Sequence, residues 1–112
     1  MSRKSELAKL ERSFGYFDDI KMIINRHGNT EAALDDREGQ YALLMCLTQI
    51  GELLGKIQSE DFVNALPIRL ISGLRNVIVH NYDGLDIHLI SRIIDFDLPE
   101  LRIVINDLLS KI

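Results

Sequence analysis

The amino-acid sequence predicts an all-α protein, an up-and-down bundle of four principal helices with short accessory helices. Apolar residues recur at intervals of three and four along most of the chain, which places them on one face of a helix. No segment alternates between apolar and polar residues with the period of two that is typical of a strand. At 112 residues and 46% apolar content, the chain is expected to form one domain, residues 1–112, with its own core.

The first helix is expected to begin at Ser5, as its cap, and to run to about Asn25. Its apolar stripe steps by three or four residues through Leu7, Leu10, Phe14, Phe17, Ile20 and Ile24. The sequence His27-Gly28-Asn29 then ends the helix, with Gly28 as the left-handed C-terminal residue. His27 is expected to interact with the negative end of the helix dipole.

A short helical turn is predicted from Glu31 to Leu34, after Asn29-Thr30. Asp35-Asp36 is expected to cap a long helix of about residues 37–58. The apolar seam of that helix consists of Leu43, Leu47, Ile50, Leu54 and Ile57.

Two glycines, Gly51 and Gly55, lie one turn apart within this long helix. Each costs about 1 kcal/mol relative to alanine. Close approach of a neighbouring helix or of a second protomer offsets that cost, or the glycines are simply tolerated on a well-packed helix. Glu52 and Lys56 have the i,i+4 spacing of a surface ion pair.

The second half of the chain predicts three more helices. A connector over residues 59–66 has room for a helical turn, and Pro67 suits the first turn of a helix that ends near Val79 or His80, before Asp83-Gly84. Asp86 is expected to cap a short helix, and Pro99 to begin a separate last one, whose stripe is Leu101, Ile105, Leu108 and Ile112. Apolar residues beyond the needs of one four-helix core predict burial in a homodimer, and they include Val77, Leu89 and Ile93.

Composition limits the kinds of partner. Thirteen Lys and Arg against seventeen Asp and Glu give a net charge of −4, and the chain has no Trp. Proteins that neutralise many phosphates are usually basic, so any RNA contact is expected through a small local site. The single cysteine, Cys46, excludes an intrachain disulfide and suits a reducing compartment. With neither a signal-peptide pattern nor a long apolar run, a cytoplasmic protein without membrane contact is expected.

The sequence lacks the residue patterns of several kinds of site. His27, His80 and His88 have no metal-ligand spacing with each other or with Cys46, so no metal site is predicted. The sequence also has no glycine-rich phosphate loop and no nucleophile elbow, and it predicts no cofactor.

One stretch gathers the residues that could carry chemistry. Arg75, His80 and Tyr82 lie close together behind an apolar run. On an unbroken helix Arg75 and His80 would diverge by about 140°, so a site is expected where the helix frays at its C-terminus. On spacing alone, the plainer interpretation is structural, with a buried arginine on a helix-end carbonyl and a capping histidine.

The same stretch resembles the signature of HEPN-domain ribonucleases, and most of all that of the HepT toxin branch. The shared pattern is Arg-x4-His-x-Tyr with a polar residue, here Asn76, directly after the arginine. The resemblance runs from about Asp36 to the C-terminus and includes Gln40-Tyr41-Ala42-Leu43-Leu44, Ile50-Gly51-Glu52, Asp86-Ile87 and Asp97-Leu98-Pro99-Glu100-Leu101.

The resemblance implies an HEPN-like fold and an endoribonuclease that needs no metal and uses two motifs across a dimer cleft. His80 would then be the general base on a ribose 2′-hydroxyl, and Arg75 would stabilise the charge of the phosphorane-like transition state. Asn76 would orient Arg75 or donate to a phosphate oxygen. The products implied are a 2′,3′-cyclic phosphate and a 5′-hydroxyl.

The resemblance also implies a partner. In this family a minimal nucleotidyltransferase antitoxin, of the MntA type, transfers AMP to the tyrosine of the motif, here Tyr82, in a type VII-like toxin–antitoxin system. Two other interpretations stay open. One is a non-catalytic helical module that docks such a nucleotidyltransferase, and the other is a dimerising scaffold in which the motif is structural.

Overall fold

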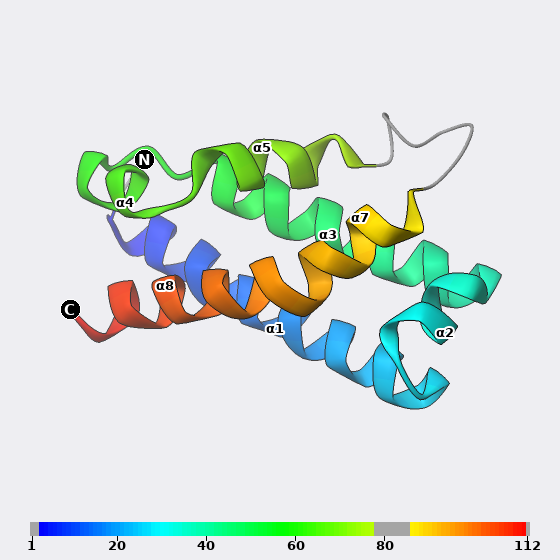
Figure 1. Ribbon diagram of the computed structural model, residues 1–112. Helices are drawn as coiled ribbons and strands as arrows, with labels where there is room; N and C mark the ends of the chain where they lie inside the picture. Colours follow the sequence, from blue (N-terminus) through cyan, green and yellow to red (C-terminus); the bar gives the residue numbers. More distant parts are fainter. Residues whose placement is uncertain (1–2, 78–85, 112) are drawn as a thin grey trace.

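The computed structural model describes residues 3–77 and 86–111, and it confirms the all-α fold. In Figure 1 the long helices alternate in direction along the molecule, as in an up-and-down bundle. In chain order the elements of this described part are α1 (Arg3–His27), α2 (Thr30–Asp35), α3 (Arg37–Gly55), α4 (Glu60–Ala65), α5 (Ile68–Arg75), α7 (Ile87–Arg92), the π-helical turn η1 (Ile93–Asp97) and α8 (Leu98–Ser110).

The start of α1 differs from the prediction. Ser5 does not cap the helix but lies inside it, where its hydroxyl accepts a hydrogen bond from Lys9 Nζ at 3.0 Å. The first turn is held instead by Arg3, whose guanidinium pairs with Asp61 Oδ2 at 2.7 Å. The same guanidinium lies 4.1 Å above the centre of the Phe62 ring. Contacts with α4, remote in sequence, therefore extend α1 toward the N-terminus.

The C-terminal end of α1 bears out the expected chemistry, although the helix runs to His27 rather than Asn25. Gly28 has φ +102°, in the left-handed region that favours glycine. His27 Nδ1 contacts the carbonyl oxygen of Ile23 at 2.8 Å, and its Nε2 lies 3.2 Å from Asp36 Oδ2. Of the predicted cap Asp35-Asp36, Asp36 caps α3, because its Oδ2 accepts from the Gly39 amide at 2.8 Å. Asn29, which opens α2, caps that helix in the same way, with its Oδ1 accepting from the Ala32 amide at 2.8 Å.

The helix α3 ends at Gly55, three residues before the predicted end at Gln58. The reason is Glu6, whose side chain is only 1% exposed. Its carboxylate accepts hydrogen bonds from the backbone amides of Gln58 at 2.9 Å and Ser59 at 3.1 Å. Burial opposes ionisation of Glu6, but the hydrogen bonds from Ser59 and Gln58 outweigh it and hold its pKa below the ordinary value of 4.5.

The last third of the chain corrects a second boundary. The elements α7, η1 and α8 follow one another without a break from Ile87 to Ser110, where two separate helices were predicted. Pro99 has no amide hydrogen, and its ring would clash with the carbonyl four residues back in a regular helix. The π-helical turn ends at Asp97, two residues before Pro99, and the Leu98 amide donates to the Ile93 carbonyl five residues back. The widened turn accommodates Pro99, so the helix continues through it.

The core is shared among all of these helices. α3 packs against both α1 and α5, and its residues Leu43, Leu47 and Ile50 are fully buried. Val77 and Ile93, predicted as surplus for a dimer, are buried within the single chain, whereas Leu89 is 48% exposed. No helix in the described ranges has the length and apolar character needed to cross a membrane.

Candidate functional site

The candidate site is built around Arg75, the last residue of α5. Ile71 and Leu74 are buried on one side of this helix and fix it against α3. The helix α5 ends at Arg75, where Asn76 forms a turn, and the predicted end at Val79 or His80 lies outside the described residues. The Asn76 amide donates to the Gly73 carbonyl at 3.2 Å, and its Nδ2 to the Ser72 carbonyl at 3.0 Å.

The two glycines of α3 make room for Arg75. A Cβ atom added at Gly51 would lie 2.7 Å from the Arg75 backbone nitrogen and 2.8 Å from its Cγ. A Cβ atom added at Gly55 would lie 3.0 Å from the Arg75 Cδ and 3.1 Å from its Nη1. The arginine side chain therefore lies along the surface of α3 from one glycine to the other. Close approach of a neighbouring helix, one of the alternatives raised by the sequence, explains both glycines.

Glu52, between these glycines, pairs with the same arginine. Arg75 Nε donates to Glu52 Oε1 at 3.3 Å, and the two side chains are 46% and 40% exposed. The predicted surface pair of Glu52 with Lys56 is therefore wrong. The glycines allow Arg75 to reach Glu52. The Glu52 carboxylate therefore pairs with Arg75 rather than with Lys56, one turn along the helix. We call Gly51, Glu52 and Gly55 the arginine cradle.

The other predicted site residues are placed only in part. Asn76 follows Arg75 directly, but its side-chain amide is bonded to its own helix rather than to the guanidinium. His80 and Tyr82 lie at 78–85, outside the described residues. The expected 140° divergence of Arg75 and His80 assumed one regular helix, and α5 ends at Arg75.

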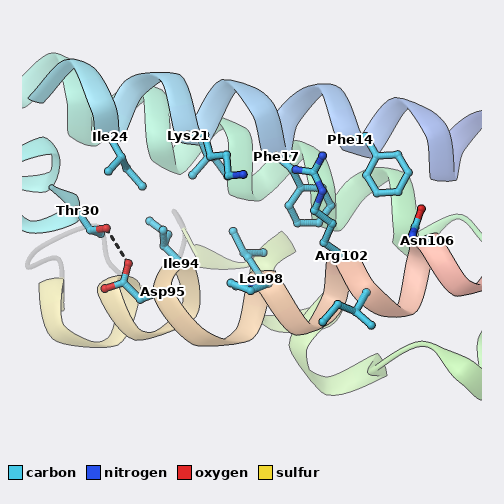
Figure 2. Close-up of a pocket in the computed structure, with 13 residues that line it drawn as sticks. Phe14, Phe17, Lys21, Ile24, Thr30, Ile94, Asp95, Leu98, Arg102 and Asn106 are labelled. Carbon is cyan, nitrogen blue, oxygen red and sulfur yellow. Dashed lines mark hydrogen bonds between the residues drawn. The ribbon is translucent and has the colours of Figure 1, made fainter. Parts of the chain in front are cut away.

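Hollows lie on more than one side of the helix formed by α7, η1 and α8. One, of about 420 Å³, adjoins the end of α5 and is lined by Arg69, Leu70, Gly73, Asn76, Val77, Leu89, Ile93 and Asp97. Another, of about 710 Å³, is a groove on the α1 side that does not include Arg75. Figure 2 shows the groove between α1 and α8, with the Thr30–Asp95 hydrogen bond at one end and Arg102 beside Phe17 toward the other.

Elsewhere, the described residues hold little reactive chemistry. No group of three or more His, Cys, Asp or Glu within 3–77 and 86–111 is arranged to hold a metal ion. Cys46 is buried, and that burial raises the pKa of its thiol to about 11, so the thiol is protonated at neutral pH. The arginine cradle is thus the arrangement that calls for a functional explanation. Sequence reasoning located Arg75 but missed Glu52, whose i,i+4 spacing pointed to Lys56.

The chain is similar to known proteins over most of its length. The family model for HepT-like ribonucleases matches residues 13–108, which include the cradle and the Arg75–Tyr82 stretch. "Putative RNase MJ0125" of Methanocaldococcus jannaschii is 26% identical over 104 residues, covering 91% of this chain and 89% of that protein. "Putative RNase MJ1216" of the same organism is 26% identical over 89 residues, covering 78% of this chain and 73% of its own length. No solved structure matches the chain.

Proposed function

The chain belongs to the HepT-like ribonuclease family, and on this basis we propose that it is the endoribonuclease toxin of a type VII-like toxin–antitoxin system. It cuts RNA without a metal ion, through Arg75 and His80 of two protomers. Two proteins that are similar to this chain over most of their length are named "Putative RNase", and these names support the reaction class. The net charge of −4 supports recognition of RNA through a small site rather than a broad basic surface.

The observation that carries the proposal is the placement of Arg75. Its guanidinium is held by the α3 helix at one edge and is about half exposed, so it can meet a phosphate from solvent. A cation that is fixed before the substrate arrives stabilises charge that develops in the transition state without reorganising first. In RNA cleavage that charge develops on the non-bridging oxygens of the phosphorane.

The proposed reaction uses the ribose 2′-hydroxyl as nucleophile. His80 removes its proton, the 2′-oxygen attacks phosphorus, and the bond to the 5′-oxygen breaks. His80 of the second protomer protonates that leaving oxygen, which gives a 2′,3′-cyclic phosphate and a 5′-hydroxyl. Arg75 stabilises the pentavalent state and favours the neutral imidazole that a base requires. Asn76, next to it, donates to a phosphate oxygen once its amide leaves Ser72.

Pairing of two protomers is part of the proposal, because two motifs supply the base and the acid. Exposed apolar side chains on α7 and η1 support it. Leu89 lines the hollow beside Asn76 and is half exposed, and Phe96, seven residues further along the chain, is 68% exposed. Large apolar side chains that are left exposed are candidates for burial at a protein interface.

Tyr82 is proposed as the point of control. A minimal nucleotidyltransferase antitoxin transfers AMP to its hydroxyl, which puts a phosphate and a base two residues after His80. The adduct competes with the RNA phosphate for Arg75 and so stops cleavage. Intact-mass analysis after co-expression with the antitoxin is expected to show one AMP increment, and that increment should vanish in Tyr82→Phe.

The decisive experiment compares wild type with His80→Ala, each incubated with total tRNA in the presence of EDTA. Both proteins are first matched for helicity and oligomeric state, and the product ends are mapped. Wild type alone should cleave and should leave cyclic phosphate ends. Cleavage by both proteins, or cleavage that EDTA abolishes, would contradict the mechanism. An unmodified, dimeric and inactive wild type would instead favour the binding module that docks a nucleotidyltransferase.

A further inference from the structure

We propose that Glu52 is a positioning residue, which holds Arg75 by its Nε edge and leaves the two terminal nitrogens for the phosphate. The helix α3 would then contribute a residue to the active site, although the predicted motif lies entirely after α5 begins. This inference rests on the proposed function, because positioning has meaning only for a phosphate that Arg75 meets.

The first step of the argument is the path of the arginine side chain. Gly51 lies against its backbone nitrogen and Cγ, and Gly55 against its Cδ, Cζ and Nη1. The four residues from Gly51 to Gly55 rise about 6 Å along α3, which matches the reach of an extended arginine side chain. The aliphatic part of Arg75 therefore lies along α3, in the space that the two glycines leave open.

The second step concerns the donors that remain. A guanidinium has five N–H donors in one plane, of which Nε carries a single one. Glu52 accepts from Nε at 3.3 Å, so the four hydrogens on the terminal nitrogens are left for another acceptor. Two parallel hydrogen bonds from a planar fork are the preferred way for arginine to bind a phosphate. A carboxylate on Nε fixes the orientation of that fork without occupying all of it.

The third step separates positioning from stability. Glu52 and Arg75 are both close to half exposed, and ion pairs of this kind contribute little to the free energy of unfolding. Loss of Glu52 should therefore leave the fold intact and allow the guanidinium to leave its place. A displacement of about 1 Å in a catalytic group can lower a rate by up to about a hundredfold.

The charge of Glu52 makes an opposite role conceivable, and the two roles predict opposite results. If Glu52 only neutralised Arg75, its removal would strengthen phosphate binding and would lower KM. If it positions Arg75, removal lowers kcat with a smaller effect on KM. Glutamine keeps an acceptor oxygen on the same arm without the charge, so Glu52→Gln distinguishes orientation from charge.

The test measures cleavage of a single-stranded RNA by wild type, Glu52→Ala and Glu52→Gln. Asp107→Asn is the matched control, since it removes an exposed ion pair with Lys111 that lies outside the cradle. We expect Glu52→Ala to lower kcat by about tenfold to a hundredfold, Glu52→Gln to retain most of it, and the control to match wild type. All four should share one thermal midpoint to within a few degrees.

A second measurement does not depend on activity. Hydrogen exchange of the Arg75 Nε proton, followed by NMR, should be slow in wild type and Glu52→Gln and fast in Glu52→Ala. Unchanged kcat in Glu52→Ala, or a lower KM in both variants, would overturn the inference while the nuclease stands. If wild type itself cleaves nothing, the proposed function fails. If the Arg75 Nε proton then also exchanges at the same rate in all three proteins, Glu52 does not hold Arg75 and the inference fails as well.

Discussion

Arg75 imposes different constraints on the two glycines that flank Glu52. At Gly51 an added methyl group would press on the Arg75 backbone, which cannot move unless α5 leaves α3. At Gly55 it would press on the far end of a flexible side chain, which can swing away. The same substitution should therefore damage stability at one position and function at the other.

For Gly51→Ala we expect a loss of about 1–3 kcal/mol in the free energy of unfolding, because the overpacked helices must separate. For Gly55→Ala we expect no loss, and a gain of up to about 1 kcal/mol from the helix propensity of alanine. RNA cleavage should nevertheless fall in Gly55→Ala, since the guanidinium is displaced. Urea unfolding and a cleavage assay on both variants test this contrast, and equal destabilisation of the two would refute it.

Glu6 gives a second prediction, which concerns acid stability. Its folded pKa lies below the ordinary 4.5, so its contribution is complete above that pH and is lost as the pH falls through the folded pKa. Glu6→Gln places an amide beside the backbone amides of Gln58 and Ser59, and should cost about 1–3 kcal/mol at neutral pH. The difference from wild type should shrink as the pH falls below 4.5 and through the folded pKa, as measured by urea unfolding. A difference that is constant with pH would argue against an ionised Glu6.

Residues whose partners lie nearby in sequence were predictable, and residues with remote partners were not. Gly28, Asn29, Asp36 and Asp86 were recognised because each caps a helix within three residues of itself. Glu6 was missed, since it meets Gln58 across 52 residues of chain. Glu52 was assigned the wrong partner for the same reason, because Arg75 lies 23 residues away.

Helix ends in this protein follow the same rule. The predicted end of α3 was three residues too late. The sequence near Gln58 gives no sign that a carboxylate from α1, that of Glu6, accepts from the Gln58 amide. Pro99 was taken as the start of a separate helix because proline usually occupies a first turn. The π-helical turn before it cannot be foreseen from local preference, and it joins α7 to α8.

The stabilisation that His27 gives to the junction of α1 with α3 should change with pH in the opposite direction to the stabilisation that Glu6 gives. The hydrogen bond to the Ile23 carbonyl, with Asp36 nearby, raises the pKa of His27 above its ordinary 6.5. The stabilisation is therefore present below about pH 6.5 and is lost as the pH rises through the folded pKa. Thermal midpoints of wild type and His27→Gln should differ more at about pH 5.5 than at about pH 8.5. An equal difference at both values would mean that His27 acts only as a neutral hydrogen-bonding group.

The acidity of the whole molecule predicts a weak dependence of RNA binding on salt. With 13 basic against 17 acidic residues, contact with phosphates is expected mainly through Arg75 of each protomer. For single strands the logarithm of the binding constant falls with a slope of about −0.7 per neutralised phosphate, so a slope of about −1 to −2 is expected. Binding of RNA to His80→Ala across a salt series gives this slope. A much steeper value would reveal a basic surface that the charge balance does not suggest.

The close fit of Arg75 against α3 also has an evolutionary consequence. Glycine at position 55 disfavours a helix, so selection retains it only while an arginine lies across it. A lineage that loses the arginine is free to accept alanine or a larger residue there and gains stability by doing so. Positions 51, 55 and 75 should therefore vary together among descendants of a common ancestor. A homologue with alanine at position 55 would be one in which the arginine at position 75 is absent, lies elsewhere or no longer binds a phosphate.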